Sequence, residues 1–228
     1  MTELAACIVH IGLHKTGTTS IQRFLQEQRG SLKEFGYNFY QGMHIAENHV
    51  ELHAATMRPD RPSTYRLKSG LVFDETYLQL TLSHVRDFLN QAGSERVVFS
   101  AEGLSLLRYV DEVEQLASLL PPNICIVAYL RCPVDYLRSH SNQLKKSGML
   151  ETVDKTSYAY MGADSWMLDY ELRLKAFRTV FGHANVHVVD YDKACALDGS
   201  VIPSFLRLLD LEDRFSVETW QGIRLNQS

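Results

Sequence analysis

Four short apolar runs without polar alternation constrain the fold more than any other feature of this sequence. They cover residues 5–11, 96–100, 124–130 and 185–191. Such runs are typical of strands buried on both faces, as in parallel sheets. Stretches with helical spacing accompany them at residues 18–29, 74–91, 111–119, 133–146, 170–181 and 201–209. We therefore expect an α/β fold with three layers (α/β/α), a mostly parallel central sheet and one domain over residues 1–228.

Individual residues mark where several of these helices begin and end. Asp74 suits the N-cap position of the second helix, and Gly93 suits its end. Pro133 is well placed as the first residue of its helix, and Gly182 follows the helix at 170–181. These positions give the predicted helices defined limits.

Two segments look irregular, residues 58–70 and 147–165. The first is rich in basic residues, and the second holds glycines and aromatic residues. Long loops in compact domains are usually functional or mobile. Because ligands of open α/β sheets bind beyond the carboxyl ends of the strands, these loops are candidates for a substrate pocket and its lid.

The composition excludes several classes of function. Lys and Arg total 23 against 27 Asp and Glu, a formal net charge of −4, so no basic excess indicates a nucleic-acid partner. The longest apolar stretches, 4–13 and 124–130, are far shorter than the roughly 18 residues of a membrane span. No basic segment precedes the first strand, so we expect no signal peptide.

The cysteines indicate a compartment. Cys7, Cys125, Cys132 and Cys195 form no CxxC pair and mostly lie in or beside apolar runs. They are typical of reduced core residues, and we therefore expect a cytoplasmic protein.

The first strand passes directly into a glycine- and threonine-rich segment, residues 12–20, which opens an amphipathic helix. Glycines allow a tight turn, while helix amides, hydroxyls and a lysine can hold a phosphate. An ATP-type loop has Gly-x-x-x-x-Gly-Lys-Ser/Thr, whereas here Lys15 precedes Gly17. Thr16 still follows the lysine, so ATP with magnesium stays an alternative. The candidate binding residues are His14, Lys15, Thr16, Gly17, Thr18, Thr19 and Ser20.

Residues 15–19, Lys-Thr-Gly-Thr-Thr, resemble a signature of the sulfotransferases that use 3′-phosphoadenosine 5′-phosphosulfate. The resemblance implies a P-loop-NTPase-like α/β fold. It also implies that these residues hold the 5′-phosphosulfate, with Lys15 at the bridging oxygen. Many cytosolic members next carry a tryptophan that stacks on adenine. Ser20 stands there in this chain, so adenine stacking must come from elsewhere.

A second anion site is expected at the end of the run 124–130, where Arg131 follows. From the residues alone, Arg131 paired with Asp135 and a solvent-facing Ser139 would be the simpler reading. However, an arginine at a strand end with a serine eight positions later resembles the 3′-phosphate motif of the same family. Arg131 and Ser139 reproduce that spacing.

Glu102 follows the run 96–100 and is the candidate general base. The structural alternative is Ser100 as an N-cap with an acid in the first helical turn. The resemblance favours the base, since carbohydrate-modifying and many bacterial sulfotransferases carry a glutamate here, where cytosolic members have a histidine.

Histidines are frequent between residues 44 and 53. His49 and His53 are one helical turn apart with Glu51 between them, which suggests zinc. The metalloprotease spacing is absent and no third ligand is evident, so we expect no metal. The segment before the helix resembles an acceptor-side segment of bacterial members, which makes His49 a secondary base or acceptor contact. His14 is expected to shape its loop, and His10 to be satisfied by a neighbour.

Together these features predict a sulfotransferase that moves a sulfuryl group to a hydroxyl of a carbohydrate, lipid or small metabolite. The catalytic residues would be Lys15, Glu102 and His49. The alternatives are a small-molecule ATP-dependent kinase and a nucleotide-binding module without turnover. The family's basic Arg-Lys-Gly element is absent, and residues 222–226 are the candidate substitute. The end at Ser228 is compatible with a truncated chain. The sequence does not indicate an oligomeric state.

Overall fold

A computed structural model describes residues 6–61, 63–146 and 148–223. Within these residues five strands form one fully parallel sheet in the order β2-β3-β1-β4-β5. The strands are β1 (Cys7–Gly12), β2 (Tyr37–Phe39), β3 (Arg96–Ser100), β4 (Ile124–Leu130) and β5 (Val186–Asp190). The predicted fold class is therefore confirmed.

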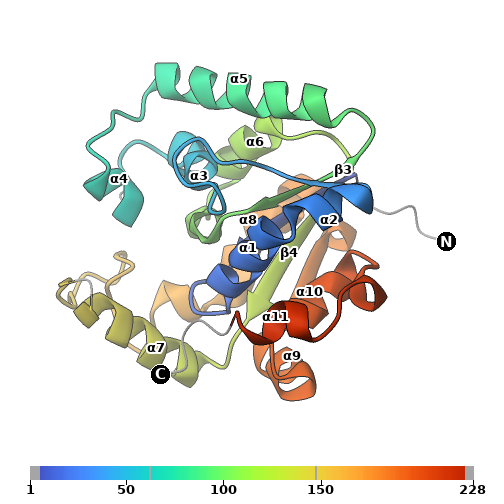
Figure 1. Cartoon of the computed structure of the whole chain (residues 1–228). Coiled ribbons are helices and arrows are strands. Elements are labelled where there is room, and N and C mark those ends of the chain that lie inside the picture. Colours follow the sequence, from blue (N-terminus) through green and yellow to red (C-terminus); the bar gives the residue numbers. More distant parts are fainter. Residues whose placement is uncertain (1–5, 62, 147, 224–228) are drawn as a thin grey trace.

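The helices alternate with the strands along the chain (Figure 1). They are α1 (Thr18–Glu27), α2 (Arg29–Glu34), α3 (Val50–Thr56), α4 (Thr64–Lys68), α5 (Glu75–Ala92), α6 (Val110–Leu119), α7 (Pro133–Lys146), α8 (Tyr170–Phe181), α9 (Tyr191–Asp198), α10 (Ile202–Leu208) and α11 (Glu218–Gln221). A 3₁₀ helix, η1 (Glu102–Leu106), follows β3.

Alternate residues of each strand face two different helical layers. In β1, Cys7, Val9 and Ile11 belong to a core shared with α3, α5, α6 and α8. Ile8 belongs to a second core shared with α1, α2, α10 and α11. In Figure 1, α1 and α2 lie in front of β4, and α5 runs along the top above α3 and α6. Because both faces of the inner strands are covered, β1 and β4 are mostly buried and apolar, whereas the edge strand β5 is largely exposed.

The predicted helix ends are confirmed at four positions. Asp74 caps α5 by accepting a hydrogen bond from the Tyr77 amide, and Gly93 follows that helix with φ of 62°. Pro133 begins α7, and Gly182 follows α8 with φ of 87°. Residue type at these positions was a sufficient signal because each satisfies a specific backbone requirement.

Some elements differ from the sequence-based expectation. The strand β2 was missed because three residues give too short a pattern. The predicted helix at 18–29 is divided, with α1 ending at Glu27 and α2 beginning at Arg29. The segment 58–70 contains the short helix α4, and α9 was not predicted. The beginning of the first predicted strand, Ser147 and residues 224–226 lie outside the described residues.

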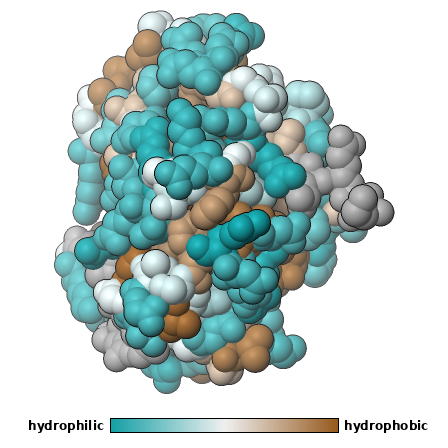
Figure 2. Space-filling model, turned by 45° about the vertical axis from the view of Figure 1, so that its right-hand side comes forward, coloured by the Kyte–Doolittle hydropathy of each residue, from teal (hydrophilic) through white to brown (hydrophobic). Residues whose placement is uncertain are grey.

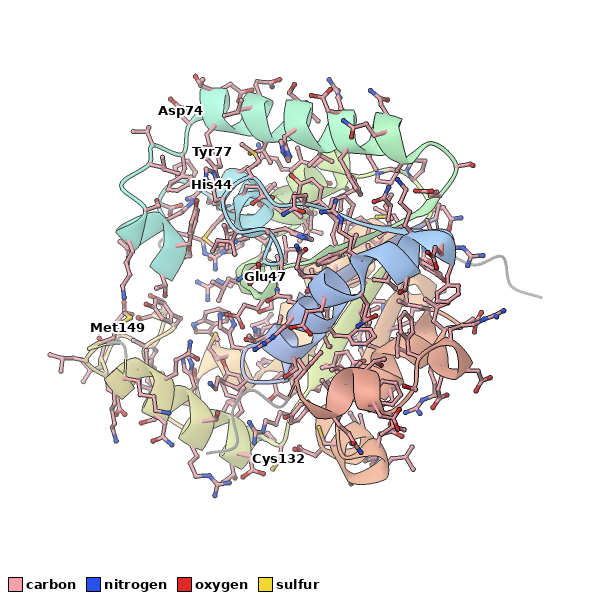
Figure 3. All side chains as sticks on the ribbon, in the orientation of Figure 1. His44, Glu47, Asp74, Tyr77, Cys132 and Met149 are labelled. Carbon is pink, nitrogen blue, oxygen red and sulfur yellow. The ribbon has the colours of Figure 1, made fainter. Side chains whose placement is uncertain are left out.

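The cysteines are all free, as expected for reduced residues. Cys7 is buried in the sheet, but Cys132 is exposed. It lies where β4 passes into α7, at the lower edge of the molecule in Figure 3. The expectation of a core position is therefore wrong for Cys132, because the strand has already ended there.

The polar residues of the chain lie mainly on its surface. On the face shown in Figure 2, hydrophilic residues cover most of the area. Within the part of the chain that the structure describes, no helix is long and apolar enough to cross a membrane.

Candidate functional site

Strand order brings three predicted site residues to one edge of the sheet. β1 lies between β3 and β4, and all three strands run in the same direction. Their carboxyl ends therefore lie side by side. The loop with Lys15 follows β1, Glu102 follows β3 and Arg131 follows β4. In open α/β sheets this edge is where ligands bind.

The loop after β1 needs glycine at two places. Gly12 and Gly17 have φ of 72° and 75°, in the left-handed region that only glycine adopts easily. A Cβ on Gly12 would lie 2.9 Å from Thr18 Oγ1, and one on Gly17 would lie 2.7 Å from Val201 Cγ1. Lys15 also has a positive φ of 68°. A strained lysine in such a loop is typical of a functional position.

Thr16 stabilises this loop from the inside. Its side chain is fully buried, and its hydroxyl donates a hydrogen bond to the backbone carbonyl of Leu13. Thr16 is thus turned away from the cavity described next. Its hydroxyl is therefore not available to a ligand.

A cavity of about 230 Å³ lies over the loop, and we call it the loop cavity. Among the loop residues that line it are Lys15, Gly17, Thr18, Thr19 and Ser20. The Thr18 side chain is buried, and within the described residues its Oγ1 has no hydrogen-bond partner. A buried hydroxyl without a partner is costly, so it indicates a place for a ligand oxygen.

One face of α7 forms the opposite wall of the loop cavity. Ser139, Asn142, Gln143 and Lys146 line it. These positions follow the i, i+3, i+4, i+7 spacing of a single helix face. Only Ser139 was predicted. The polar stripe can be seen in the sequence. However, the sequence does not show what α7 packs against, so the stripe resembles an ordinary solvated surface.

Arg131 is attached to the loop. Its Nη1 donates a 3.1 Å hydrogen bond to the Lys15 carbonyl, and its guanidinium lies 5.3 Å from the ring centroid of Tyr191. Asp135 pairs with Arg138 instead, so the simpler Arg131–Asp135 pair is not formed. Arg131 lines a separate hollow with Asp192 rather than the loop cavity itself. The structure therefore brings Arg131 to the loop from one side and Ser139 from another.

Glu102 lies in the first turn of η1 and lines the loop cavity with Lys15. Ser100 is not the cap of this helix: Ala101 holds that position, and Ser100 Oγ lies 2.9 Å from His10 Nδ1. The alternative of simple capping by Ser100 is therefore wrong, and His10 has the neighbour we expected.

The charges of Glu102 and Lys15 are coupled. Burial raises the pKa of the Glu102 carboxyl, and the positive charge of Lys15 partly opposes this shift. Burial also lowers the pKa of Lys15, the Glu102 carboxylate opposes it, and the positive charges of Lys146 and Arg131 lower it further. Both shifts favour the uncharged forms and bring the two groups closer to neutral pH, where proton transfer is most useful.

A second cavity of about 350 Å³ adjoins the first, and we call it the histidine cavity. His14, His53 and His140 line it. Glu102 and Gln143 line both cavities, so they mark the junction between them.

Both irregular segments contribute to the histidine cavity. Residues 63–65 and Lys68 come from the first, and Met149 and Tyr158 from the second. Thr64 Oγ1 donates a 3.0 Å hydrogen bond to Tyr158 Oη, which joins the two segments. In Figure 3, Met149 lies between α4 and α7.

Comparisons with known proteins place the fold. No family model and no curated protein matches the chain. A solved sulfotransferase from Alicyclobacillus acidocaldarius is similar with a TM-score of 0.64 and 16% identity, over 100% of this chain and 88% of that one. The sulfotransferase domain from the curacin biosynthetic pathway is similar with a TM-score of 0.53 and 12% identity, over 99% and 80%. This chain has a sulfotransferase fold. The resemblance inferred from residues 15–19 is thus confirmed at the level of the fold.

Within this sulfotransferase fold, two histidines lie elsewhere than expected. His14 lines the histidine cavity rather than the loop cavity, because its side chain turns toward Ser105. His49 lines neither cavity. It is fully buried, its Nδ1 accepts a 2.9 Å hydrogen bond from the Ser100 amide, and its ring packs against Tyr40. The structure does not bring His49 to the site.

The structure also shows the surroundings of the histidine-rich segment. Within the described residues, no group of three or more His, Cys, Asp or Glu side chains could hold a metal ion. His49 and His53 are both buried, and His53 Nε2 lies 3.1 Å from Ser63 Oγ. His49 is the N-cap of α3, and most residues of this helix are buried, so both histidines are part of the packed interior.

Proposed function

We propose that this protein is an enzyme that transfers the sulfuryl group of 3′-phosphoadenosine 5′-phosphosulfate to a hydroxyl of a small-molecule or carbohydrate acceptor. The observation that carries the proposal is the position of Glu102. It lines both the loop cavity, where Lys15 and Thr18 offer donors to an anion, and the histidine cavity, which can hold a second molecule. A base at the junction of two cavities suits transfer between two substrates.

The residues of the loop cavity suit the sulfuryl donor. Thr18 Oγ1 is buried without a partner in the described residues, and Lys15 and Lys146 supply positive charge. Amides at the N-terminus of α1 would add further donors. Arg131 and Ser139, which flank the loop, would hold the 3′-phosphate. Arg131 Nε makes no hydrogen bond among the described residues, but it lies 3.9 Å from Asp192 Oδ1, so a 3′-phosphate would compete with this long ion pair.

The chain's own groups would act on the reacting atoms as follows. Glu102 takes the proton of the acceptor hydroxyl as its oxygen forms a bond to sulfur. The bond between sulfur and the 5′-phosphate oxygen breaks, and 3′-phosphoadenosine 5′-phosphate leaves with the electron pair. Lys15, Thr18 and the loop amides stabilise the charge that grows on this oxygen. Fixed donors of this kind are typically worth several kcal/mol.

The position of Thr16 argues against the kinase alternative. In an ATP-type loop the hydroxyl after the lysine binds magnesium. Here that hydroxyl is buried and bonded to Leu13. The proposed reaction needs no metal, because the leaving charge falls on a phosphate that the loop already holds.

The test is turnover of a labelled sulfuryl donor by the full chain, first without acceptor and then with a panel of hydroxyl compounds. We expect slow hydrolysis of the donor that Lys15→Ala abolishes, and faster consumption with an acceptor. Glu102→Gln should bind the donor normally and lose roughly 100-fold or more of the rate. Glu114→Gln, at an exposed position of α6, is the control. Donor binding without any turnover would favour the non-catalytic module, and the absence of donor binding would refute the proposal.

A further inference from the structure

The hydrogen-bond partners of His140 show which of its ring nitrogens carries the hydrogen. The side chain is buried, and Nε2 lies 2.8 Å from the backbone carbonyl of Tyr158. A carbonyl can only accept, so Nε2 carries the hydrogen. In the neutral ring Nδ1 is then a bare acceptor. This Nδ1 is buried, and within the described residues it has no partner.

His14 also has one ring nitrogen that donates and one that can accept a hydrogen bond. The Ser105 hydroxyl donates to the Glu102 carbonyl at 2.8 Å and lies 3.3 Å from His14 Nδ1. Because the nearer partner, a carbonyl, takes the hydroxyl proton, His14 Nδ1 donates to Ser105. Its Nε2 is then an acceptor as well. The two imidazole rings are 6.3 Å apart.

Burial favours the neutral form of both rings, and a buried arginine adds to this effect. Arg173 is 1% exposed and donates to the carbonyls of Met167 and Ser105 and to Ser105 Oγ. Burial is the main cause that lowers the pKa of His14 and His140, and the charge of Arg173 adds to it. These rings are therefore poor bases, and they offer lone pairs rather than charged donors. Glu102 and the histidines thus have separate roles.

The remaining wall of the histidine cavity has an apolar part and a polar part. Ile45, Val50, Leu106, Leu144 and Met149 form the apolar part, and Asn48, Ser63, Thr64 and Lys68 are in the polar part. A volume of about 350 Å³ lies at the lower end of the range for small-molecule sites. The apolar part of this wall, together with a few fixed acceptors, favours a compact molecule that has an apolar body and matching donors.

We propose, building on the function proposed above, that the acceptor is a small molecule with an apolar body and two hydroxyls, one facing Glu102 and the other donating to Nδ1 of His140. A vicinal diol or a catechol has this chemistry. A compound with a single hydroxyl would leave the buried nitrogen without a partner, which costs about a factor of ten or more in kcat/KM.

The test compares matched acceptors that differ by one hydroxyl: catechol with phenol, 1,2-cyclohexanediol with cyclohexanol, and 1,2-hexanediol with 1-hexanol. The readout is transfer of labelled sulfuryl by the full chain. For each diol that the protein uses, we expect kcat/KM to be about tenfold or more higher than for the matching compound with one hydroxyl. Equal rates within the pairs would overturn the inference. The inference would also be overturned if none of the six compounds were used while the donor was still hydrolysed in a reaction that depends on Lys15. In that case the proposed transferase site would still stand.

A variant separates recognition from folding. His140→Phe keeps an aromatic ring on Tyr136, on which His140 now stacks at 5.6 Å, and removes the acceptor nitrogen. We expect the preference for the diol to fall to near unity, whatever the change in the overall rate. His183→Phe, exposed in the turn before β5, is the control and should keep the preference. Donor hydrolysis that persists in His140→Phe shows that the variant is folded. A preference that survives in His140→Phe would contradict the assignment.

Discussion

Arg131 Nη1 donates a 3.1 Å hydrogen bond to the backbone carbonyl of Lys15, across 116 positions of sequence. The bond joins the end of β4 to the loop after β1, and so connects the two segments that the sequence indicated for the two ends of one nucleotide. Arg131 is therefore attached to the loop that the proposed donor would contact. This relationship is the structural basis of the proposed donor site.

Adjacent lysines at the end of α7 give a matched pair. Lys146 lines the loop cavity, whereas Lys145 is exposed outside it. Lys146→Met should weaken binding of 3′-phosphoadenosine 5′-phosphate about fivefold at low salt, because one partly screened cation near the ligand is worth up to about 1 kcal/mol. Lys145→Met should leave the affinity unchanged. Calorimetric titration measures both, and equal losses would show that only the general charge of α7 matters.

Two glycine variants separate loop geometry from helix propensity. In Gly17→Ala the Cβ must accept φ of 75° and lie 2.7 Å from Val201 Cγ1. We expect the free energy of unfolding to fall by about 2 kcal/mol or more, and the donor to bind poorly. Gly30→Ala, in α2 with open space around it, should be neutral or stabilise by up to about 1 kcal/mol. Urea unfolding distinguishes them. A harmless Gly17→Ala would mean that the loop is not held in this conformation.

The pH range in which the donor is turned over should be limited by Glu102 on the acid side and by Lys15 on the alkaline side. Burial raises the pKa of Glu102 above its ordinary 4.5, so the base is lost at a higher pH than usual as the solution is acidified. The pKa of Lys15 is lowered from 10.5, mainly by burial, so its charge is lost earlier on the alkaline side. Measuring kcat/KM from pH 5 to 10 should give a bell. An acid limb that persists unchanged in the residual activity of Glu102→Gln would assign the base to another group.

A buried carboxyl away from both cavities makes stability depend on pH. Glu51 is fully buried, and burial raises its pKa to about 7 from 4.5. The folded chain therefore holds a proton that the unfolded chain releases. The free energy of unfolding should fall between these pH values as pH rises, by up to roughly 3 kcal/mol. Glu51→Gln should remove this slope and be the more stable protein at pH 8. Parallel pH dependences for the two proteins would show that Glu51 titrates normally.

Much of the fold was accessible from sequence because its signals are local. Apolar runs gave four strands, and the glycine-rich loop gave the turn into α1. Arg131 and Ser139 were singled out because their spacing resembles a family motif, and their role in binding the donor stays a prediction. These features need only neighbouring residues to be recognised, and the chain order then determines which strand ends can meet.

The rest depends on contacts between distant segments. The direction of the His14 side chain follows from Ser105, and the burial of His49 follows from Tyr40 and the Ser100 amide. The α7 face that includes Lys146 acquires meaning only when it is placed opposite the loop. None of these partners is near in sequence, so residue type alone could not separate a cavity wall from a solvated surface.

The most direct measurement of the central claim is calorimetric binding of 3′-phosphoadenosine 5′-phosphate, adenosine 5′-phosphate and ATP with magnesium to the full chain. We expect the first to bind tightly, and to stabilise the protein by about 2.7 kcal/mol at one hundred times its dissociation constant. Removal of the 3′-phosphate should weaken binding at least tenfold, and Ser139→Ala should lose much of that difference. Tighter binding of ATP with magnesium, or equal affinity with and without the 3′-phosphate, would contradict the account.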